Sequence, residues 1–561
     1  MGLAYFKFLT IANYCELWKL KINTKKSTYT IFSRSSKQGK RHINLSLNQE
    51  PLTKEDNPVY LGIKLDRQMQ MKEQIECLKE KANKRLNLIK RLTSTTWGSD
   101  KQTLRQLYVG YVRSVLDHSL PFQTIASKQS TDNLDRIQNQ ALRLICGGMK
   151  TTPTAACEIE ANIEPPDLRR NRVLLETVER YKRLDPEHPN RKLVENWKQQ
   201  QRLQQKSLMD LAMEEEEKHH LPQQRMQETK CPQPPPWYKL HQPTIRTSLL
   251  DETVNKQTES PVLKTCALDT IDSYPTSAIH VYTDGSASET SAGYGYYLKY
   301  PDGAKHEWSN SCGNHSSNFE AELTAIKTSV QEIHQQFDLG EKETSRIVIF
   351  SDSSSALDAL KYPPYRSELL SNTALSIHQL MAAHSVQLTL QWIPGHSDIQ
   401  GNEIADKLAK TGAGKPQQEN QCTLDTVKHI LKTQTKKQWL DRWRSGTTGR
   451  TYFAERDKPT MKDDINKMDR RNQSQIFQFR TGHAAVNYHL NRIMPQHEPL
   501  CRHCDHPYET VPHILFDCPK LKNQRKLLPP NPTIHNTLYG SLDQLHKTAS
   551  FIRLAMTDKS A

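Results

Sequence analysis

Four carboxylates in a fixed order are the residues of this 561-residue chain with the clearest chemical potential: Asp284 in YTDGS, Glu322 in FEAELTAI, Asp352 in IFSDSSSAL and Asp406 in GNEIADKLAK. A histidine, His396 in the loop IPGHSDIQGNE, precedes the last of them. Carboxylates that converge on one spot repel one another unless divalent cations neutralise them. Metal ions held by carboxylates are a common means of attacking phosphodiesters. The four motifs therefore predict a metal site with hydrolytic chemistry.

The segments around these residues predict the strands of one sheet. AIHVYTD, GYGYYLKY and HEWSNSC are expected to form three consecutive strands joined by glycine-rich turns. RIVIFSD is expected to be a short buried strand that ends on Asp352, and VQLTLQWIP a fifth strand.

Helices are expected between and after these strands. Apolar residues recur at three- and four-residue steps from Phe319 onward, which predicts a helix with Glu322 at the border of its packed face. Residues 367–384 and 402–413 are expected to form further helices, the last with Asn402 at its N-cap. This order of elements predicts an α/β domain with a mixed five-stranded sheet.

Residues 274–414 resemble a type 1 ribonuclease H domain, the class that cuts the RNA strand of an RNA–DNA hybrid. The motifs YTDGS, AEL, SDSSSAL, GHSDIQGNE and IADKLA match that family in order. Glu320 also lies near the required position, but the AEL context favours Glu322. Asp398 stands where related retroelement sequences often carry glycine, a departure that would stiffen the histidine loop without touching the ligands.

The resemblance implies two-metal hydrolysis. The four carboxylates would hold two Mg²⁺ (or Mn²⁺) ions roughly 3.5–4 Å apart across the scissile phosphate. His396 would transfer protons or help the product leave, rather than bind metal by default. Asn318 matches a position from which the family contacts 2′-hydroxyl groups, which distinguish RNA from DNA.

Composition and charge fit a modular protein that binds nucleic acid. The length predicts three or four domains. Residues 1–150 contain 26 lysine and arginine residues against 12 aspartate and glutamate residues, whereas residues 274–414 contain 9 against 16. Because an acidic domain binds a polyanion poorly on its own, we expect the basic segment to supply most of the affinity for RNA–DNA hybrid, RNA or DNA. A basic surface that is merely solvated is the alternative.

The sequence predicts neither a membrane segment nor a secretory signal. No apolar run approaches the roughly 18 residues that a membrane span requires. The N-terminal stretch MGLAYFKFLTIANYCELWKLK is interrupted by Lys7 and Glu16 and lacks a small-residue cleavage site. Eleven cysteines, mostly single, suit a reducing compartment. We therefore expect an intracellular protein, nuclear or cytoplasmic.

The basic segment has a resemblance of its own. TYTIFSR, HINLSLN and VYLGIKLD are expected strands, followed by helices near residues 70–97, 101–118 and 131–147. With LDRIQNQALRLICGGMKTTP they resemble the late palm, thumb and connection of a non-LTR, jockey-like retrotransposon reverse transcriptase. Elements of that group join this region to a ribonuclease H domain. No aromatic-x-Asp-Asp strand occurs, so we expect no polymerase activity from this chain, and a polymerase-competent retroelement protein is a candidate partner.

Four consecutive segments are therefore expected. Residues 1–185 would be the reverse-transcriptase remnant, 186–273 a polar linker, 274–414 the ribonuclease H domain and 415–561 a helical C-terminal region. The linker contains the Gln-rich run QQQRLQQK and the stiff run CPQPPPW, and we expect it to act as a spacer.

Cysteine and histidine spacing in CRHCDHPYETVPHILFDCP predicts a zinc site within residues 501–518. Three thiolates and one imidazole at short spacing would close a tetrahedral site, as in a zinc knuckle. The expected ligands are Cys501, Cys504, His513 and Cys518. His503 and His506 lie inside the same run and are alternatives to His513. Four nearby cationic or imidazole side chains are candidate phosphate contacts: Arg480, His483, His489 and Arg492.

Two classes of function compete at this point. The preferred one is a metal-dependent endoribonuclease acting on RNA–DNA hybrids, derived from a retrotransposon polyprotein. The alternative is a non-catalytic nucleic-acid-binding remnant that uses the basic segment and the zinc knuckle. A DDE-type transposase or integrase would share the sheet, but the position of the AEL glutamate as second carboxylate and the closing GHS…GNE…AD helix disfavour it.

Overall fold

The computed structural model describes residues 14–557, apart from residues 34, 48–49, 199–205, 220, 223, 227–239, 252, 254–257, 259, 289–290, 341–343, 364 and 366. The expected polyproline run, almost all of the Gln-rich run and the first thirteen residues lie outside the described residues. The chain divides into two compact units, each built from separate stretches of sequence. The first unit comprises Met1–Leu175, Gln199–Lys218 and Lys432–Ala561, and the second comprises Glu176–Lys198 and His219–Leu431.

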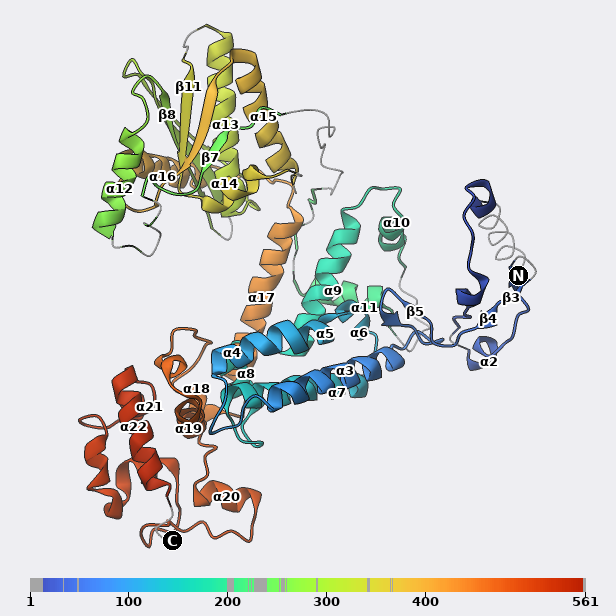
Figure 1. Ribbon diagram of the computed structural model, residues 1–561, viewed down its shortest axis with the longest axis vertical. Helices are drawn as coiled ribbons and strands as arrows, with labels where there is room; N and C mark the ends of the chain where they lie inside the picture. Colours follow the sequence, from blue (N-terminus) through green and yellow to red (C-terminus); the bar gives the residue numbers. More distant parts are fainter. Residues whose placement is uncertain are drawn as a thin grey trace. The chain divides into compact units, whose positions relative to one another are not determined.

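The second unit is built on a mixed six-stranded sheet (Figure 1). Its strands are β7 (Thr244–Arg246), β8 (Ile279–Ala287), β9 (Ala292–Lys299), β10 (Lys305–Ser311), β11 (Arg346–Ser351) and β12 (Gln387–Trp392). The order across the sheet is β10-β9-β8-β11-β12-β7; the first three strands are antiparallel and the pairs from β8 to β7 are parallel. The predicted α/β class and the five predicted strands are confirmed, but the predicted total of five is wrong.

The sixth strand, β7, comes from the region predicted to be linker. It pairs in parallel with Thr389–Gln391 of β12 at the edge of the sheet. A three-residue segment carries too short a pattern to stand out from surroundings rich in glutamine and proline. Helices α10 (Pro189–Glu195), α11 (Leu208–Glu217) and α12 (Ser260–Asp272) also lie in this region. It is therefore more than a spacer.

Helices cover both faces of the sheet. They are α13 (Asn318–Asp338), α14 (Ser354–Lys361), α15 (Glu368–His384) and α16 (Gln400–Ala413). A Cβ atom at Gly285 of β8 would collide with Ala321 and Glu322 of α13, and one at Gly295 of β9 would collide with Leu408 of α16. Gly285 and Gly295 occupy successive register positions, so they face opposite sides of the sheet. Helix α13 thus packs on one face and α16 on the other.

The start of α16 differs from the prediction. The helix begins at Gln400 with Ile399 as N-cap, and no side chain caps it. Asn402, predicted as N-cap, is buried in the first turn instead. An asparagine before an apolar repeat is a typical N-cap, and this pattern favoured Asn402. The helix instead begins two residues earlier, at Gln400.

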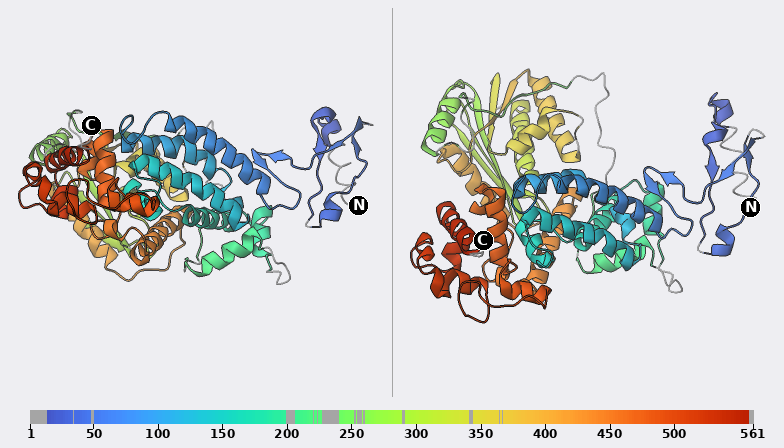
Figure 2. Two further views of the ribbon diagram at one scale, coloured as in Figure 1. Left: turned by 90° about the horizontal axis from the view of Figure 1, so that it is seen from below. Right: turned by 60° about the horizontal axis from the view of Figure 1, so that its bottom comes forward.

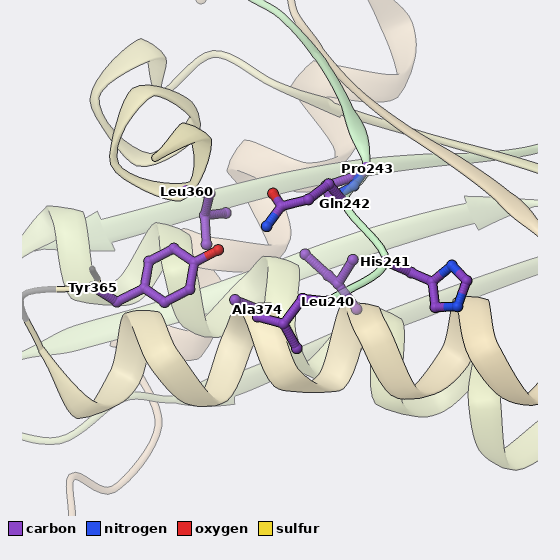
Figure 3. Close-up of a pocket in the computed structure, with 8 residues that line it drawn as sticks. Leu240, His241, Gln242, Pro243, Leu360, Tyr365 and Ala374 are labelled. Carbon is purple, nitrogen blue, oxygen red and sulfur yellow. The ribbon is translucent and has the colours of Figure 1, made fainter. Parts of the chain in front are cut away.

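A small cavity separates the segment before β7 from helices α14 and α15 (Figure 3). It is lined by Leu240, His241, Gln242, Pro243, Leu360, Tyr365, Ala374 and Ile377. Its volume of about 10 Å³ is room for a single water molecule. This cavity is a packing defect rather than a substrate site.

The first unit is mainly helical. Its helices include α3 (Lys72–Lys90), α4 (Lys101–Leu107), a π-helical turn at Tyr108–Arg113, α5 (Ser114–Asp117), α6 (Leu120–Gln123), α7 (Lys128–Cys146) and α8 (Thr154–Ala161). Its C-terminal part adds α18 (Arg450–Phe453), α19 (Arg470–Thr481), α20 (Asn487–Ile493), α21 (Ile534–Leu538) and α22 (Leu542–Ala555). Two further helices, α9 (Pro166–Lys182) and α17 (Leu424–Ser445), belong partly to each unit. Helices α3 and α7 lie side by side (Figure 2).

The three helices predicted after residue 70 are present, with one interruption. The expected helix over 101–118 is broken by the π-helical turn and ends at Asp117. In the described residues, the three strands predicted before residue 70 are reduced to two-residue pieces: β1 (Thr28–Tyr29), β2 (Ser46–Leu47), β5 (Val59–Tyr60) and β6 (Ile63–Lys64). Two more short strands, β3 (Glu50–Pro51) and β4 (Thr53–Lys54), lie between the predicted ones. These pieces pair only two at a time, so no larger sheet supports them.

One hydrophobic core joins the two ends of the chain. It contains Leu78 and Leu142 from the N-terminal helices together with Phe477, Cys518 and Phe551 from the C-terminal region. The four-segment division stays a prediction, but the first and last of those segments share this core. Among the described residues, no helix is long and apolar enough to cross a membrane.

Candidate functional site

Three of the four predicted carboxylates converge beside the two central strands of the sheet, β8 and β11, near the C-terminal end of β11. Asp284 lies on β8, Glu322 in the second turn of α13, and Asp352 directly follows β11. One oxygen from each lies within 4.8 Å of the others. Asp284 and Glu322 are buried, whereas Asp352 is partly exposed. The convergence that the motifs predict is therefore present for these three side chains.

Strand pairing accounts for two of them and a close helix contact for the third. Strands β8 and β11 run parallel, and Thr283 is the register partner of Ser351. The residues that follow this pair, Asp284 and Asp352, therefore lie next to each other at the same end of the two strands. Gly285 follows Asp284, and its missing side chain lets the backbone of α13 lie against β8 at Glu322.

The ambiguity between the two glutamates has a structural answer. Glu320 completes a capping box: Ser317 N–H donates to its Oε2 at 2.7 Å, and the Ser317 hydroxyl donates to the same oxygen at 2.8 Å. The Thr426 hydroxyl donates to it as well, at 3.1 Å. Glu320 therefore holds the start of α13, and Glu322 is the residue in the carboxylate group.

The electrostatics of the group favour a bound cation. Burial, then the charge of Asp352, raises the pKa of Asp284 to about 7. Burial and the charges of Asp284 and Asp352 raise the pKa of Glu322 well above its usual range. A divalent cation favours the ionised forms and so offsets this repulsion.

The donor set fits a hard cation. Glu322 Oε2 is buried and has no hydrogen-bond partner among the described residues, which leaves a lone pair free for a ligand. Carboxylate oxygens are the ligands that Mg²⁺ prefers, and one to two carboxylates per ion are usual. Three converging carboxylates can thus hold Mg²⁺ or Mn²⁺.

Asp406, the fourth predicted carboxylate, is on α16 and is not part of the group of three. Its Oδ2 accepts a hydrogen bond from Lys410 Nζ at 2.5 Å. Its charge still reaches the group, because it contributes to the raised pKa of Asp284. The motifs do not indicate Lys410, although a lysine four residues after an aspartate on a helix commonly forms an ion pair with it.

The histidine loop passes directly beside Asp352. A Cβ atom at Gly395 would collide with Asp352 Oδ2, so a larger residue here would displace the Asp352 carboxylate from its position in the group. The next residue, His396, is exposed and has a left-handed backbone with φ of 50°. Asp398 also has a positive φ, 51°, which explains why glycine would suit that position.

Asn318 is the first residue of α13 and is exposed. It lies one turn before Glu322 on the same helix, so it can reach a ligand bound over the carboxylates. Its contact with a 2′-hydroxyl group stays a prediction.

A mixed α/β sheet with acidic side chains gathered at the ends of adjacent parallel strands defines a domain suited to metal-dependent chemistry. In comparison with known proteins, residues 276–414 match the family described as RNase H. A ribonuclease H of Orientia tsutsugamushi (strain Boryong) is 28% identical over 140 residues, which are 24% of this chain and 81% of that relative. The match covers this domain and not the rest of the chain.

Three solved structures are similar over the same share of the chain. RNase H1 of Halobacterium salinarum NRC-1 is 21% identical, with 24% of this chain and 96% of that chain covered and a TM-score of 0.20. LC11-RNase H1, solved with an RNA/DNA hybrid, is 19% identical, with 24% and 97% covered and a TM-score of 0.21. The N-terminal RNase H domain of a Mycobacterium tuberculosis protein is 19% identical, with 24% and 94% covered and a TM-score of 0.20. At these TM-scores the three structures add nothing to the family match.

The four predicted zinc ligands also converge, in the first unit. The Sγ atoms of Cys501 and Cys518 are 3.9 Å apart, those of Cys504 and Cys518 are 3.8 Å apart, and Cys504 Sγ lies 3.4 Å from His513 Nε2. Zn–S and Zn–N bonds of about 2.3 and 2.0 Å at tetrahedral angles give ligand separations of roughly 3.5–3.8 Å. The group therefore fits a closed zinc site.

The two alternative imidazoles have other roles. His503 Nε2 lies 2.6 Å from the carbonyl oxygen of Ala555, and His506 Nδ1 lies 2.8 Å from that of Tyr508. The ring of His506 stacks on the ring of His513. His513 is therefore the imidazole of the group.

Of the four candidate phosphate contacts, Arg480 and His489 are buried, and His483 has a lowered pKa. Arg480 is only 1% exposed and forms an ion pair with Asp463 at 2.6 Å, so it is wrong as a phosphate contact. His489 is 5% exposed. Burial and the neighbouring His489 lower the pKa of His483 to about 4, so it is neutral at physiological pH. Arg492 is exposed. A pattern of basic residues does not distinguish a surface cation from one that neutralises a buried acid.

Proposed function

We propose that residues 274–414 hydrolyse the RNA strand of RNA–DNA hybrids in a reaction that depends on Mg²⁺ or Mn²⁺. The observation that supports this most is the convergence of Asp284, Glu322 and Asp352 within a domain that matches the RNase H family. Metal ions held there would supply an activated water and stabilise the departing 3′ oxygen.

Each side chain has a stated task in this proposal. Asp284, Glu322 and Asp352 bind the ions, and Asp406 completes the ligand set when Lys410 releases it. His396, in the loop that Gly395 brings against Asp352, transfers a proton or helps the product leave. Asn318 selects RNA by contact with a 2′-hydroxyl group.

The remainder of the chain would deliver the hybrid to this site. We infer a retrotransposon origin from the resemblance of residues 1–185 to a reverse-transcriptase remnant and of residues 501–518 to a zinc knuckle. The basic first 150 residues would supply most of the electrostatic affinity, since residues 274–414 carry more acidic than basic side chains.

A cleavage assay with one isosteric variant tests the proposal. Full-length protein is incubated with a labelled RNA–DNA hybrid and Mg²⁺ beside Asp352→Asn and the control Asp358→Asn, which changes an exposed aspartate on α14. Substitution of a residue that only supports a metal ligand typically lowers activity by roughly 10–100-fold. Substitution of the ligand itself should lower activity further. We expect cleavage by the wild type and by Asp358→Asn, and at least about a 100-fold loss in Asp352→Asn.

Two outcomes would contradict this function. Equal cleavage by wild type and Asp352→Asn would place the activity elsewhere. Binding of the hybrid without cleavage by any of the three proteins would instead favour the non-catalytic nucleic-acid-binding alternative.

A further inference from the structure

Two histidines and an aspartate meet at the C-terminal ends of α13 and α15. His334 and Asp338 lie one turn apart on α13, and His384 is the last residue of α15. One possible ligand atom from each lies within 4.8 Å of the others. Asp338 follows Glu322 by sixteen positions, which is about 24 Å along an α-helix. The group is therefore separate from the carboxylates of the candidate active site.

We propose that His334, Asp338 and His384 bind one divalent transition-metal ion that clamps the ends of the two helices together. This site is independent of the proposed nuclease function and of the zinc ligands in the first unit.

The distances suit coordination of a shared ion. His384 Nε2 lies 3.1 Å from Asp338 Oδ1, and His334 Nε2 lies 3.7 Å from Asp338 Oδ2. Ligand atoms about 2.1 Å from one ion, at angles between octahedral and tetrahedral values, are roughly 3.0–3.4 Å apart. The His384 separation falls in this range, and the His334 separation would have to shorten by about 0.3 Å when an ion binds. The two imidazole rings are 5.1 Å apart and nearly perpendicular, at 85°, so they approach a common point from different directions.

His384 Nε2 is the ligand atom of the group whose hydrogen bonding is least satisfied. It is buried and lies at ion-pair distance, 3.1 Å, from Asp338 Oδ1, but it makes no hydrogen bond within the described part of the chain. Phe337 packs edge-on against the same ring at 5.3 Å. A buried imidazole nitrogen without a hydrogen-bond partner is costly, and a metal ion bound to its lone pair would remove that cost.

Charge and access also favour a cation here. Both α13 and α15 end at this point, and the C-terminal end of a helix carries a partial negative charge. Asp338 adds a full negative charge, and its side chain is 61% exposed, which gives an ion a path from solvent.

The ligand types define the class of ion. Imidazole nitrogen suits Zn²⁺, Ni²⁺, Cu²⁺ and Co²⁺, whereas Mg²⁺ prefers oxygen ligands and keeps its water. Millimolar Mg²⁺ should therefore occupy the carboxylates without competing at this site. Two histidines and one carboxylate leave coordination positions open to water.

Metal uptake by the intact chain tests the proposal. Full-length protein without a polyhistidine tag is loaded with one equivalent of Zn²⁺ to fill the Cys501–Cys518 group, kept in excess Mg²⁺, and titrated with Ni²⁺ by calorimetry. The variants are His384→Gln, His334→Gln and the conservative Asp338→Asn, whose exposed position makes misfolding a minor concern. His429→Gln, at an exposed histidine of α17, is the matched control.

We expect wild type and His429→Gln to bind one Ni²⁺, and each of the three ligand variants to lose that binding. At Ni²⁺ concentrations about 100-fold above Kd, the melting temperature of the wild type should rise by about 5–10 °C, and that of the ligand variants should not. Equal Ni²⁺ uptake by wild type and His384→Gln, or no uptake by either, would overturn the proposal and leave the three side chains as an ion-paired bracket. Cleavage activity plays no part in these readouts, so a failed nuclease proposal leaves them unaffected.

Discussion

Two glutamates two residues apart on α13 should respond to substitution in opposite ways. Glu320 accepts hydrogen bonds from Ser317 and Thr426 and so holds the start of the helix. Burial, and then the charges of Asp284 and Asp352, raise the pKa of Glu322. Glu320→Ala should therefore reduce stability and leave cleavage intact, whereas Glu322→Gln should abolish cleavage and raise stability when Mg²⁺ is absent.

The magnitudes follow from the contacts. Loss of the capping interaction costs about 1 kcal/mol, and loss of the Thr426 hydrogen bond about 1 kcal/mol more. A loss of about 2 kcal/mol lowers the melting temperature of a unit of this size by about 4–8 °C. For Glu322→Gln the expected change in stability has the opposite sign. An acid with a raised pKa in the folded state opposes folding above its ordinary pKa, by about 1.4 kcal/mol per unit. Glutamine removes that cost, so we expect the melting temperature to rise at pH 7.5.

Thermal melts with and without Mg²⁺, run beside the hybrid cleavage assay, separate the two roles. Mg²⁺ should stabilise the wild type and Glu320→Ala but not Glu322→Gln. Glu320→Gln, which retains an oxygen for the capping box, is the control and should lie close to wild type. If Glu320→Ala lost cleavage at unchanged stability while Glu322→Gln still cut, the assignment of the two glutamates would be reversed.

Three further substitutions test other parts of the molecule. Gly395→Ala would displace the Asp352 carboxylate, because the new methyl group collides with its Oδ2, so hybrid cleavage should fall by about 10–100-fold. Gly110→Ala, whose new methyl group meets no atom within 4 Å, should leave cleavage unchanged; equal rates would refute the close approach. Burial, reinforced by Asp167, raises the pKa of Glu158 from 4.5 to about 8. The folded chain therefore holds a proton that the unfolded chain releases above pH 4.5, and stability should fall as pH rises from about 4.5 to 8. Glu158→Gln should flatten that decline, by up to a few kcal/mol in the free energy of unfolding at pH 8, as followed by denaturant unfolding at several pH values; an unchanged slope would show that Glu158 is not its source. Cys504→Ser should remove one zinc ion per chain from purified protein, as measured by elemental analysis, and should destabilise the first unit, because a structural zinc site contributes on the order of 10 kcal/mol in isolated peptides; unchanged zinc content would show that the ion is bound elsewhere.

The candidate site was largely predictable because its residues sit inside local motifs. YTDGS places Asp284 within β8, IFSD places Asp352 directly after β11, and parallel pairing of the two strands brings these aspartates together. The motifs do not show which other side chains each carboxylate contacts. The ion pair of Asp406 with Lys410 and the capping role of Glu320 depend on side-chain directions that sequence spacing allows but does not determine.

The fold was predictable where apolar periodicity was long and failed where it was short. Helix α13 has an apolar stripe over 21 residues, and the helix predicted from Phe319 onward is present. Strand β7 has three residues and owes its place to pairing with β12, which no local pattern records. Arg480 was misread for a related reason. Its partner Asp463 lies on a different element, and only the folded chain shows that its charge is already neutralised.

The buried ions around Arg480 explain why the two ends of the chain belong to one unit. Arg480 and Asp463 come from the C-terminal region, while Glu160 and Lys101 come from the N-terminal region, and all four are at most 8% exposed. Lys101 and the Tyr452 hydroxyl both contact Glu160, which Arg480 approaches to 3.8 Å. Arg456 also donates to Asp463, at 2.9 Å, so both buried acids are compensated by positive charges inside the shared core. Removal of one partner would leave a charge buried without compensation, which is far more costly than the intact pair is stabilising. A chain cut after the RNase H domain would leave Lys101 and Glu160 without their C-terminal partners and expose the apolar core of the N-terminal helices, so the zinc-containing region should be required for the basic segment to fold.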